Sequence, residues 1–136
     1  MSIKPREKTP ELSVDLVGGG NWTLSAQTPE NLTMIVAYRG FHCPVCKSYT
    51  RQLDRLVEDY NQLGVTVVTL SMDSQERAEK TREEWGIKHV PIGYGLTLET
   101  ARAWGLYTSK AIKDNEPEVF SEPGLFLIKP DGTLYL

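Results

Sequence analysis

Two strand-like runs enclose an amphipathic segment, and this order constrains the fold more than any other feature of the chain. Residues 31–38 are almost continuously apolar, and residues 65–71 are rich in β-branched side chains; both patterns are typical of buried strands. Between them, apolar residues recur at helical spacing from Tyr49 to Leu63. A strand–helix–strand unit of this kind predicts an α/β layered domain.

The rest of the chain continues this alternation. We expect a hairpin over residues 12–25, a helix from a cap at Asp73 or Ser74 to Gly86, a short strand at 90–92, a helix over 96–104, a charged loop over 108–121 and a final hairpin over 125–136. Residues 1–11 are predicted to be a flexible lead-in to a single domain over 12–136. The chain stops inside the last predicted strand. We therefore expect either that the natural C-terminus extends further or that a partner protein packs over this strand.

Composition narrows the classes of function. The chain has 136 residues and a net charge of -3, so no basic patch favours nucleic acid or an anionic membrane surface as a partner. No run approaches the roughly 20 apolar residues of a membrane span. The charged N-terminal segment does not resemble a signal peptide, and a cytoplasmic location is the expectation.

The only two cysteines lie in the sequence Cys43-Pro44-Val45-Cys46 at the start of the predicted helix. Unpaired backbone N–H groups and the helix dipole favour a thiolate at this position. A structural zinc site needs four ligands, and only His42 and His89 could join the cysteines. We therefore expect a redox dithiol and no metal. Pro44 limits the conformations of the turn and should influence the redox potential.

Three stretches give the chain a resemblance to a known family. They are Tyr38-Arg-Gly-Phe-His-Cys-Pro-Val-Cys46, Val67-Val-Thr-Leu-Ser-Met-Asp-Ser74 and Glu122-Pro-Gly-Leu-Phe-Leu-Ile-Lys-Pro-Asp-Gly132. Together they resemble the thioredoxin-like superfamily, and within it the peroxiredoxin-like (AhpC/TSA, redoxin) branch. The resemblance covers nearly all of residues 12–136. It implies a thioredoxin-like α/β fold, with a central mixed sheet flanked by helices.

The resemblance also implies roles for particular residues. Peroxiredoxins usually carry threonine where this chain has Cys43, and their peroxidatic cysteine falls on Cys46. They usually carry arginine just before the last hairpin, where thioredoxins carry a cis-proline and this chain has Pro123. We therefore expect a cis Glu122–Pro123 bond packed against the cysteines, with Glu122 and Pro123 offering a backbone edge to an extended substrate. Pro91 is the competing candidate for a cis bond.

Two further residues near the cysteines have open roles. Arg39 could stabilise a thiolate or a peroxide oxygen, or it could only pair with a helix carboxylate. His42 could place a positive charge beside the cysteines and favour the thiolate, or it could be a solvent-facing loop residue.

We expect a thiol–disulfide oxidoreductase, in which Cys43 attacks a substrate disulfide and Cys46 resolves the mixed disulfide. The second interpretation is a thiol peroxidase, with Cys46 attacking peroxide and Cys43 resolving the sulfenic acid. The third is a redox-inert binding domain on the same fold. The sequence contains no flavin or nucleotide motif, so electrons are expected from thioredoxin, glutathione or a reductase. An oligomer is compatible with each interpretation.

Overall fold

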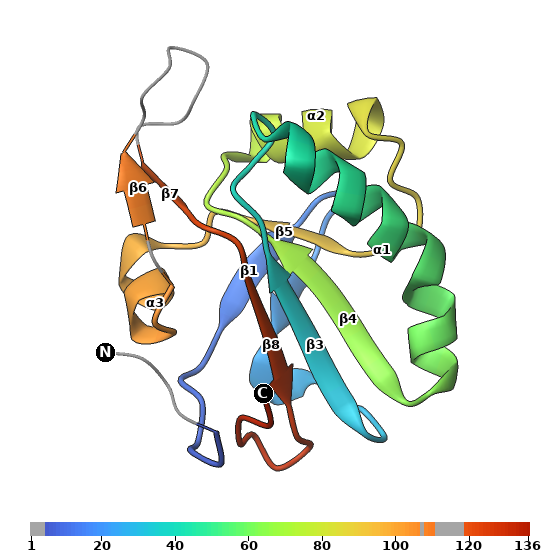
Figure 1. The fold of residues 1–136 in the computed structure, drawn as a ribbon, viewed down its shortest axis with the longest axis vertical. Helices are drawn as coiled ribbons and strands as arrows, with labels where there is room; N and C mark the ends of the chain where they lie inside the picture. The colour runs from blue at the N-terminus through green and yellow to red at the C-terminus, as the bar shows by residue number, and fades with distance from the viewer. Residues whose placement is uncertain (1–4, 107, 111–118) are drawn as a thin grey trace.

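The computed structural model describes residues 5–106, 108–110 and 119–136 (Figure 1). Its elements, in chain order, are β1 (Ser13–Leu16), β2 (Asn21–Thr23), the 3-10 turn η1 (Leu24–Ala26), β3 (Leu32–Ala37), α1 (Pro44–Gln62), β4 (Val65–Leu70), α2 (Gln75–Glu84), β5 (Ile92–Tyr94), α3 (Leu98–Ala103), β6 (Thr108–Lys110), β7 (Val119–Ser121) and β8 (Gly124–Ile128). This order confirms the predicted alternation of strands and helices.

Six strands form one mixed sheet in the order β2-β1-β5-β4-β3-β8. Strand β3 pairs with β4 in parallel, from Leu32 opposite Val65 to Ala37 opposite Leu70. It pairs with β8 on its other side in antiparallel orientation. The expected thioredoxin-like α/β fold, with a central mixed sheet flanked by helices, is confirmed.

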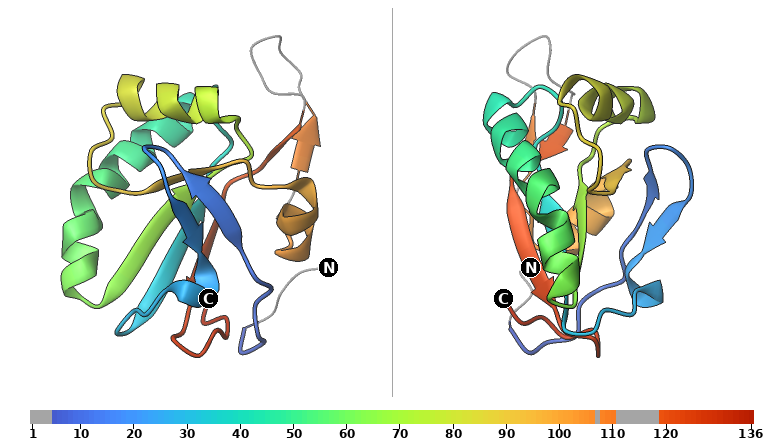
Figure 2. Two further views of the ribbon diagram at one scale, coloured as in Figure 1. Left: turned by 180° about the vertical axis from the view of Figure 1, so that it is seen from behind. Right: turned by 90° about the vertical axis from the view of Figure 1, so that its right-hand side faces the viewer.

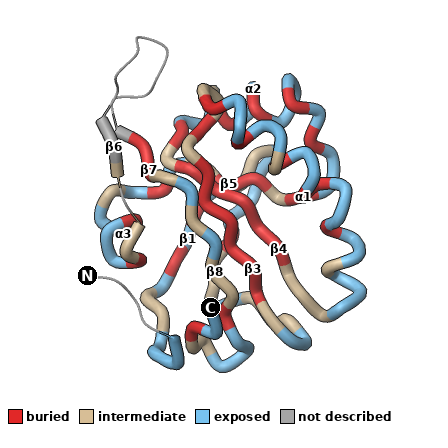
Figure 3. Tube along the Cα trace, in the orientation of Figure 1, coloured by how far each residue is buried: buried red, intermediate tan, exposed pale blue. Residues whose placement is uncertain are grey.

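Two apolar cores lie on opposite faces of this sheet. Alternate side chains of β3 point to opposite sides, as the pleat of a strand requires: Met34 and Val36 pack in the core beneath α1 and α2, and Ile35 and Ala37 pack in the core beneath α3. Figure 2 shows α1 along one face of the sheet. Figure 3 shows that β3 and β4 are buried for most of their length.

Local sequence explains where α1 begins and ends. Cys43 is its N-cap with extended backbone, and Pro44 occupies the first helical position, where the missing N–H costs no hydrogen bond. Leu53 and Val57 form part of its buried face. Gly64 follows the C-cap with a φ of +78°, a left-handed conformation that glycine adopts without strain.

The segment over 108–121 differs from the predicted loop. Strands β6 and β7 pair in antiparallel orientation, from Thr108 opposite Ser121 to Lys110 opposite Val119, in a two-stranded sheet of their own. Each strand is only three residues long, too short to produce a recognisable alternation in the sequence. Phe120, in β7, is fully buried. Residues 111–118, which the loop prediction also covered, lie outside the described residues.

The predicted final hairpin is present, and the N-terminal segment packs beside it. Leu127 N–H donates to the Leu136 carbonyl at 2.9 Å, so the C-terminal arm returns along β8. Arg6 N–H donates to the Leu134 carbonyl at 2.7 Å, and Thr9 N–H to the Gly132 carbonyl at 3.0 Å. Residues 6–9, expected as a lead-in, are therefore hydrogen-bonded to this arm. Residues 1–4 lie outside the described residues.

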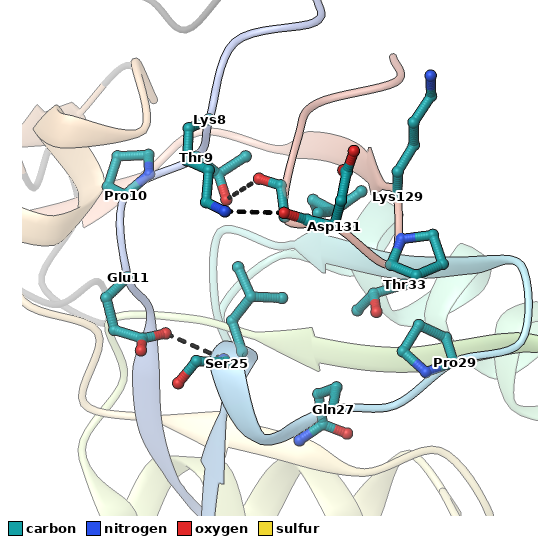
Figure 4. A pocket seen from close by; sticks show the side chains of 14 residues that line it. Lys8, Thr9, Pro10, Glu11, Ser25, Gln27, Pro29, Thr33, Lys129 and Asp131 are labelled. Carbon is teal, nitrogen blue, oxygen red and sulfur yellow. Dashed lines mark hydrogen bonds between the residues drawn. The ribbon is translucent and has the colours of Figure 1, made fainter.

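A cavity of about 290 Å³ lies between the N-terminal segment and the turn of the last hairpin. Figure 4 shows Lys8, Glu11 and Asp131 around it, with the Lys8 ammonium bonded to the Asp131 carbonyl at 2.9 Å. Thr33, at the start of β3, also lines it. Because the cysteines follow the other end of β3, this cavity is remote from them. No helix in the described part of the chain is long and apolar enough to cross a membrane.

Candidate active site

The two cysteines lie at the beginning of α1, beside the end of the sheet where β3 finishes (Figure 1). Cys43 caps the helix, and its sulfur accepts the backbone N–H of Cys46 at 3.3 Å. Both cysteines are free thiols. Cys43 retains 5% of its surface in contact with solvent and Cys46 retains none. The expected start of the helix at the cysteines is confirmed, and Cys43 is the slightly less buried residue of the two.

The Cys46 thiol is held in its protonated form. Burial, together with the interaction with Cys43, raises the pKa of this thiol to about 11. Two donors oppose this effect by favouring the thiolate. The Tyr49 hydroxyl donates to the Cys46 sulfur at 3.5 Å, and the backbone amide of Arg39 acts in the same direction. The two sulfurs therefore differ in chemical character, although they lie one helical turn apart.

The loop between β3 and α1 is fixed by a carboxylate that follows β4. Phe41 N–H donates to Oδ2 of Asp73 at 2.9 Å. Gly40 has a φ of +142°, and a Cβ at this position would lie 2.7 Å from Oδ1 of Asp73. Only glycine therefore allows the loop backbone to approach the carboxylate this closely. The cysteine turn is held against the end of β4 as a consequence.

Asp73 is a site residue whose role the sequence did not reveal. The sequence offers both Asp73 and Ser74 as caps of α2, and Ser74 performs that function by accepting the Arg77 N–H. The Asp73 carboxylate is almost fully buried. Burial raises the pKa of Asp73, while the Phe41 N–H and the charges of Arg77 and His42 oppose the rise. The sequence does show a glycine after β3 and an aspartate after β4. It does not show that they meet, because their contact depends on the parallel pairing of these two strands.

His42 is half-buried in the loop between β3 and α1. Both of its ring nitrogens are buried, and its ring meets Phe120 edge-on, with 4.7 Å between the ring centres. The solvent-facing alternative for His42 is therefore wrong. Its charge acts on the carboxylate of Asp73, which in turn holds the loop through the Phe41 N–H.

Arg39 pairs with Glu122. The two side chains approach to 3.3 Å between Nε and Oε2, and each is about one-third exposed, at 31% and 33%. The guanidinium also lies 4.8 Å from the centre of the Phe120 ring, within the range of a cation–π contact. Arg39 therefore pairs with a carboxylate, as one of the two alternatives expected. The carboxylate is not on a helix, however, because Glu122 lies in the connection between β7 and β8.

The expected cis bond before Pro123 is wrong. No peptide bond in the described residues is cis, including those before Pro123 and Pro91. Pro123 is also exposed, so its ring is not packed against the cysteine turn. Strand β7 continues directly into β8, where Gly124 pairs with Ala37, and the extended path between them suits a trans bond. The analogy with the cis-proline of thioredoxins therefore fails.

The two residues between the cysteines are apolar and exposed. Pro44 is exposed at the start of α1, and Val45 is 73% exposed, whereas both cysteines are buried. Within the described ranges, no group of three or more His, Cys, Asp or Glu side chains is placed to hold a metal ion.

Solved structures with the same fold come from several organisms. A cysteine-to-serine mutant of PrxQ from Xylella fastidiosa superposes with a TM-score of 0.81 at 16% identity, over 100% of this chain and 85% of that chain. Peroxidoxin BcpB of Mycobacterium tuberculosis gives 0.79 at 15% identity, over 97% and 82%. An uncharacterized conserved protein from Geobacillus kaustophilus gives 0.72 at 23% identity, over 97% and 67%. These similarities show the fold.

Sequence comparison identifies the family. A search of curated proteins found none that matches this chain. The sequence model of the AhpC/TSA family, by contrast, matches residues 5–136, which is almost the whole chain and includes both cysteines. The chain therefore belongs to the AhpC/TSA family of thiol-dependent peroxidases and oxidoreductases, as its thioredoxin-like fold and its cysteine-bearing helix indicate.

Proposed function

We propose that this protein is a thiol–disulfide oxidoreductase that uses Cys43 and Cys46 as a redox dithiol. One observation carries the proposal: the Cys46 N–H donates to the Cys43 sulfur at 3.3 Å at the start of α1, and the buried Cys46 has a pKa raised to about 11. Cys46 is a poor nucleophile at neutral pH, because the thiolate is the reactive form. Cys43 is therefore the attacking sulfur, and Cys46 is the protonated partner held in reserve.

The cycle has two exchange steps. The Cys43 thiolate attacks one sulfur of a substrate disulfide, forms a mixed disulfide and releases the first substrate thiolate. Cys46 then gives up its proton and attacks the Cys43 sulfur. The second substrate thiolate leaves and takes up a proton, and the Cys43–Cys46 disulfide remains. Two electrons pass from the dithiol to the substrate, and a thiol donor returns them to the enzyme.

Peroxide reduction is the second candidate, because the chain belongs to a family that includes thiol peroxidases. In that reaction, Cys46 would attack a peroxide, release an alcohol or water, and become a sulfenic acid that condenses with Cys43 and loses water. The trans bond before Pro123 also favours this candidate, because it removes the resemblance to thioredoxins on which the expectation of exchange partly rested. Two observations support exchange against it. Cys46 is completely buried as a protonated thiol, and the nearby Arg39 side chain is paired with Glu122.

Insulin reduction and peroxide consumption, assayed on one preparation, test this proposal. We expect the wild-type protein to reduce insulin, and Cys43→Ser to abolish that activity. Ser48→Ala, an exposed change on the same helix, is the matched control and should behave as wild type. Rapid peroxide consumption that persists in Cys43→Ser, with sulfenic acid at Cys46, would contradict the proposal and establish the peroxidase. Failure of both assays would instead support the redox-inert binding domain.

A reducing compartment such as the cytoplasm suits this cycle, because a dithiol is kept reduced there. We propose thioredoxin, glutathione or a dedicated reductase as the electron donor. Supplying each donor in turn to the oxidised protein, and measuring the return of free thiols, identifies which of them supports turnover.

A further inference from the structure

The second exchange step places an unusual demand on Cys46. Its sulfur must become a thiolate before it can attack the mixed disulfide, yet its side chain has no contact with solvent. Water therefore cannot stabilise the charge, and the protein must do so. In the described part of the chain, the Tyr49 hydroxyl is the side-chain group that donates a hydrogen bond to this sulfur, at 3.5 Å.

We propose that Tyr49 is a catalytic residue for the resolving step, because its hydroxyl stabilises the Cys46 thiolate that attacks the mixed disulfide on Cys43. This inference rests on the exchange function proposed above. The backbone amide of Arg39, which also favours the charged sulfur, is the second donor. Together they would act as a small anion hole around Cys46, comparable in principle to donors that stabilise a developing charge in other enzymes.

The position of Tyr49 keeps this donor in place. Tyr49 follows Cys46 by three residues on α1, a spacing that puts two side chains on the same helix face. Its ring packs against the core beneath α1 and α2. Burial raises the pKa of the Tyr49 hydroxyl above its ordinary value, so the hydroxyl remains protonated and remains a donor throughout the working pH range.

Two other titratable groups lie near Cys46. In the resting dithiol, Cys43 raises the pKa of Cys46 through a hydrogen bond and through its charge, but Cys43 carries no charge once it is bonded to the substrate in the mixed disulfide. Burial raises the pKa of Tyr38, at the end of β3, so this hydroxyl stays protonated and uncharged when Cys46 ionises. In the resolving step, the contribution of Tyr49 therefore acts against burial.

The step balances without a further reactant. The Cys46 thiol gives up its proton, and its sulfur attacks the Cys43 sulfur of the mixed disulfide. The bond between Cys43 and the substrate breaks as the bond between Cys43 and Cys46 forms. The departing substrate thiolate takes up one proton, and Tyr49 keeps its own proton throughout.

Ellman's reagent separates the two steps in one experiment. Attack by Cys43 releases one coloured thiolate and leaves the second as a mixed disulfide; attack by Cys46 then releases the second. We compare wild type, Tyr49→Phe and Tyr60→Phe by stopped flow across a range of pH. Phenylalanine keeps the ring packing of Tyr49 and removes only the donor. Tyr60, a partly buried tyrosine on the same helix, provides the matched control.

We expect Tyr49→Phe to leave the first release unchanged and to slow the second about threefold. Losing a hydrogen bond to a charged group should raise the apparent midpoint of the second step by about one pH unit. That shift lowers the thiolate fraction about tenfold, and the greater nucleophilicity of the more basic sulfur recovers about threefold. Tyr60→Phe should leave both steps unchanged.

The possible outcomes distinguish this inference from the function on which it rests. A second release in Tyr49→Phe that keeps the wild-type rate and pH midpoint would overturn the role of Tyr49 while leaving exchange intact. Absence of the first release in the wild-type protein would overturn the exchange function itself. Equal slowing in Tyr49→Phe and Tyr60→Phe would show a general effect on α1 and would also overturn the catalytic role.

Discussion

At the scale of single residues, the site depends on the different surroundings of two identical side chains. Cys43 caps α1 and accepts an N–H from the helix, while Cys46 lies fully buried one turn further on. The spacing of the cysteines and the helix after them could be predicted from the sequence, because both are local features. The contacts of Tyr49 and Asp73 could not be predicted, because they depend on side-chain direction and on the pairing of β3 with β4.

The unequal surroundings predict an order of alkylation. Iodoacetamide at about pH 8 should modify Cys43 first in the reduced protein, because the thiolate is the reactive form and the pKa of Cys46 is raised to about 11. In Cys43→Ser, the rate of modification of Cys46 should continue to rise with pH up to about this value. Peptide mapping by mass spectrometry identifies the labelled residue. Preferential labelling of Cys46 would reverse the assigned roles.

Asp73 predicts a pH dependence of folding. Burial raises the pKa of Asp73 above its ordinary value of 3.8, so the folded protein retains a proton that the unfolded chain releases. Its contribution to stability is therefore complete below 3.8 and is lost as the pH rises through the raised value. Asp73→Asn keeps an acceptor oxygen for Phe41 and does not titrate.

Urea unfolding across this pH range measures the effect. The free energy of unfolding of wild type should fall relative to that of Asp73→Asn as the pH rises from about 4 towards neutrality. If the free energy of unfolding of wild type instead rises relative to that of Asp73→Asn over this pH range, the favourable charges of Arg77 and His42 outweigh the burial of the carboxylate.

At the scale of elements, the local sequence predicts regular segments better than it predicts their connections. The predicted bounds of β3, α1 and β4 agree with the structure within two residues, because each has a clear apolar pattern and a glycine or cap at its end. The β6–β7 hairpin and the trans Glu122–Pro123 bond were missed. Both features belong to the segment that leads through β7 into β8, the strand at the edge of the sheet. No local sequence pattern predicts the path of this segment.

One buried carboxylate joins α1 to the loop before β5. Asp54 accepts the backbone N–H groups of Lys88, His89 and Val90 at distances from 2.7 to 3.3 Å. Burial alone would raise the pKa of Asp54, but these three hydrogen bonds outweigh it and lower the pKa. The stabilisation is therefore present above the ordinary value of 3.8 and is lost as the pH falls through the lowered value.

Asp54→Ala should lower the free energy of unfolding by about 2–3 kcal/mol at neutral pH, because it leaves three backbone N–H groups, one of them the buried N–H of Val90, without their acceptor. The loss should be smaller at a pH below the lowered pKa, where the wild-type carboxylate is itself protonated. Glu58→Ala, an exposed change on α1, should cost much less. Urea denaturation of the three proteins provides the measurement, and equal losses in both variants would contradict the assigned role of Asp54.

At the scale of the whole molecule, the fold separates the cysteines from the cavity at the other end of the sheet. The cysteines follow the end of β3, beside the end of β4 and the connection that leads into β8. The cavity beside Lys8 and Asp131 lies at the other end (Figure 4). The fold class could be predicted from three stretches of sequence, since they span the chain. The choice between exchange and peroxide reduction depends on which sulfur attacks, and that choice depends on burial.

Trapping the intermediate with single-cysteine variants tests this central claim most directly. Cys46→Ser and Cys43→Ser are each incubated with glutathione disulfide at neutral pH, and their intact masses are measured without reductant. Cys46→Ser should accumulate a stable glutathione adduct on Cys43, because the attacking sulfur is present and the resolving sulfur is absent. Cys43→Ser should remain unmodified. An adduct that forms on Cys46 in Cys43→Ser, with none on Cys43 in Cys46→Ser, would contradict the account.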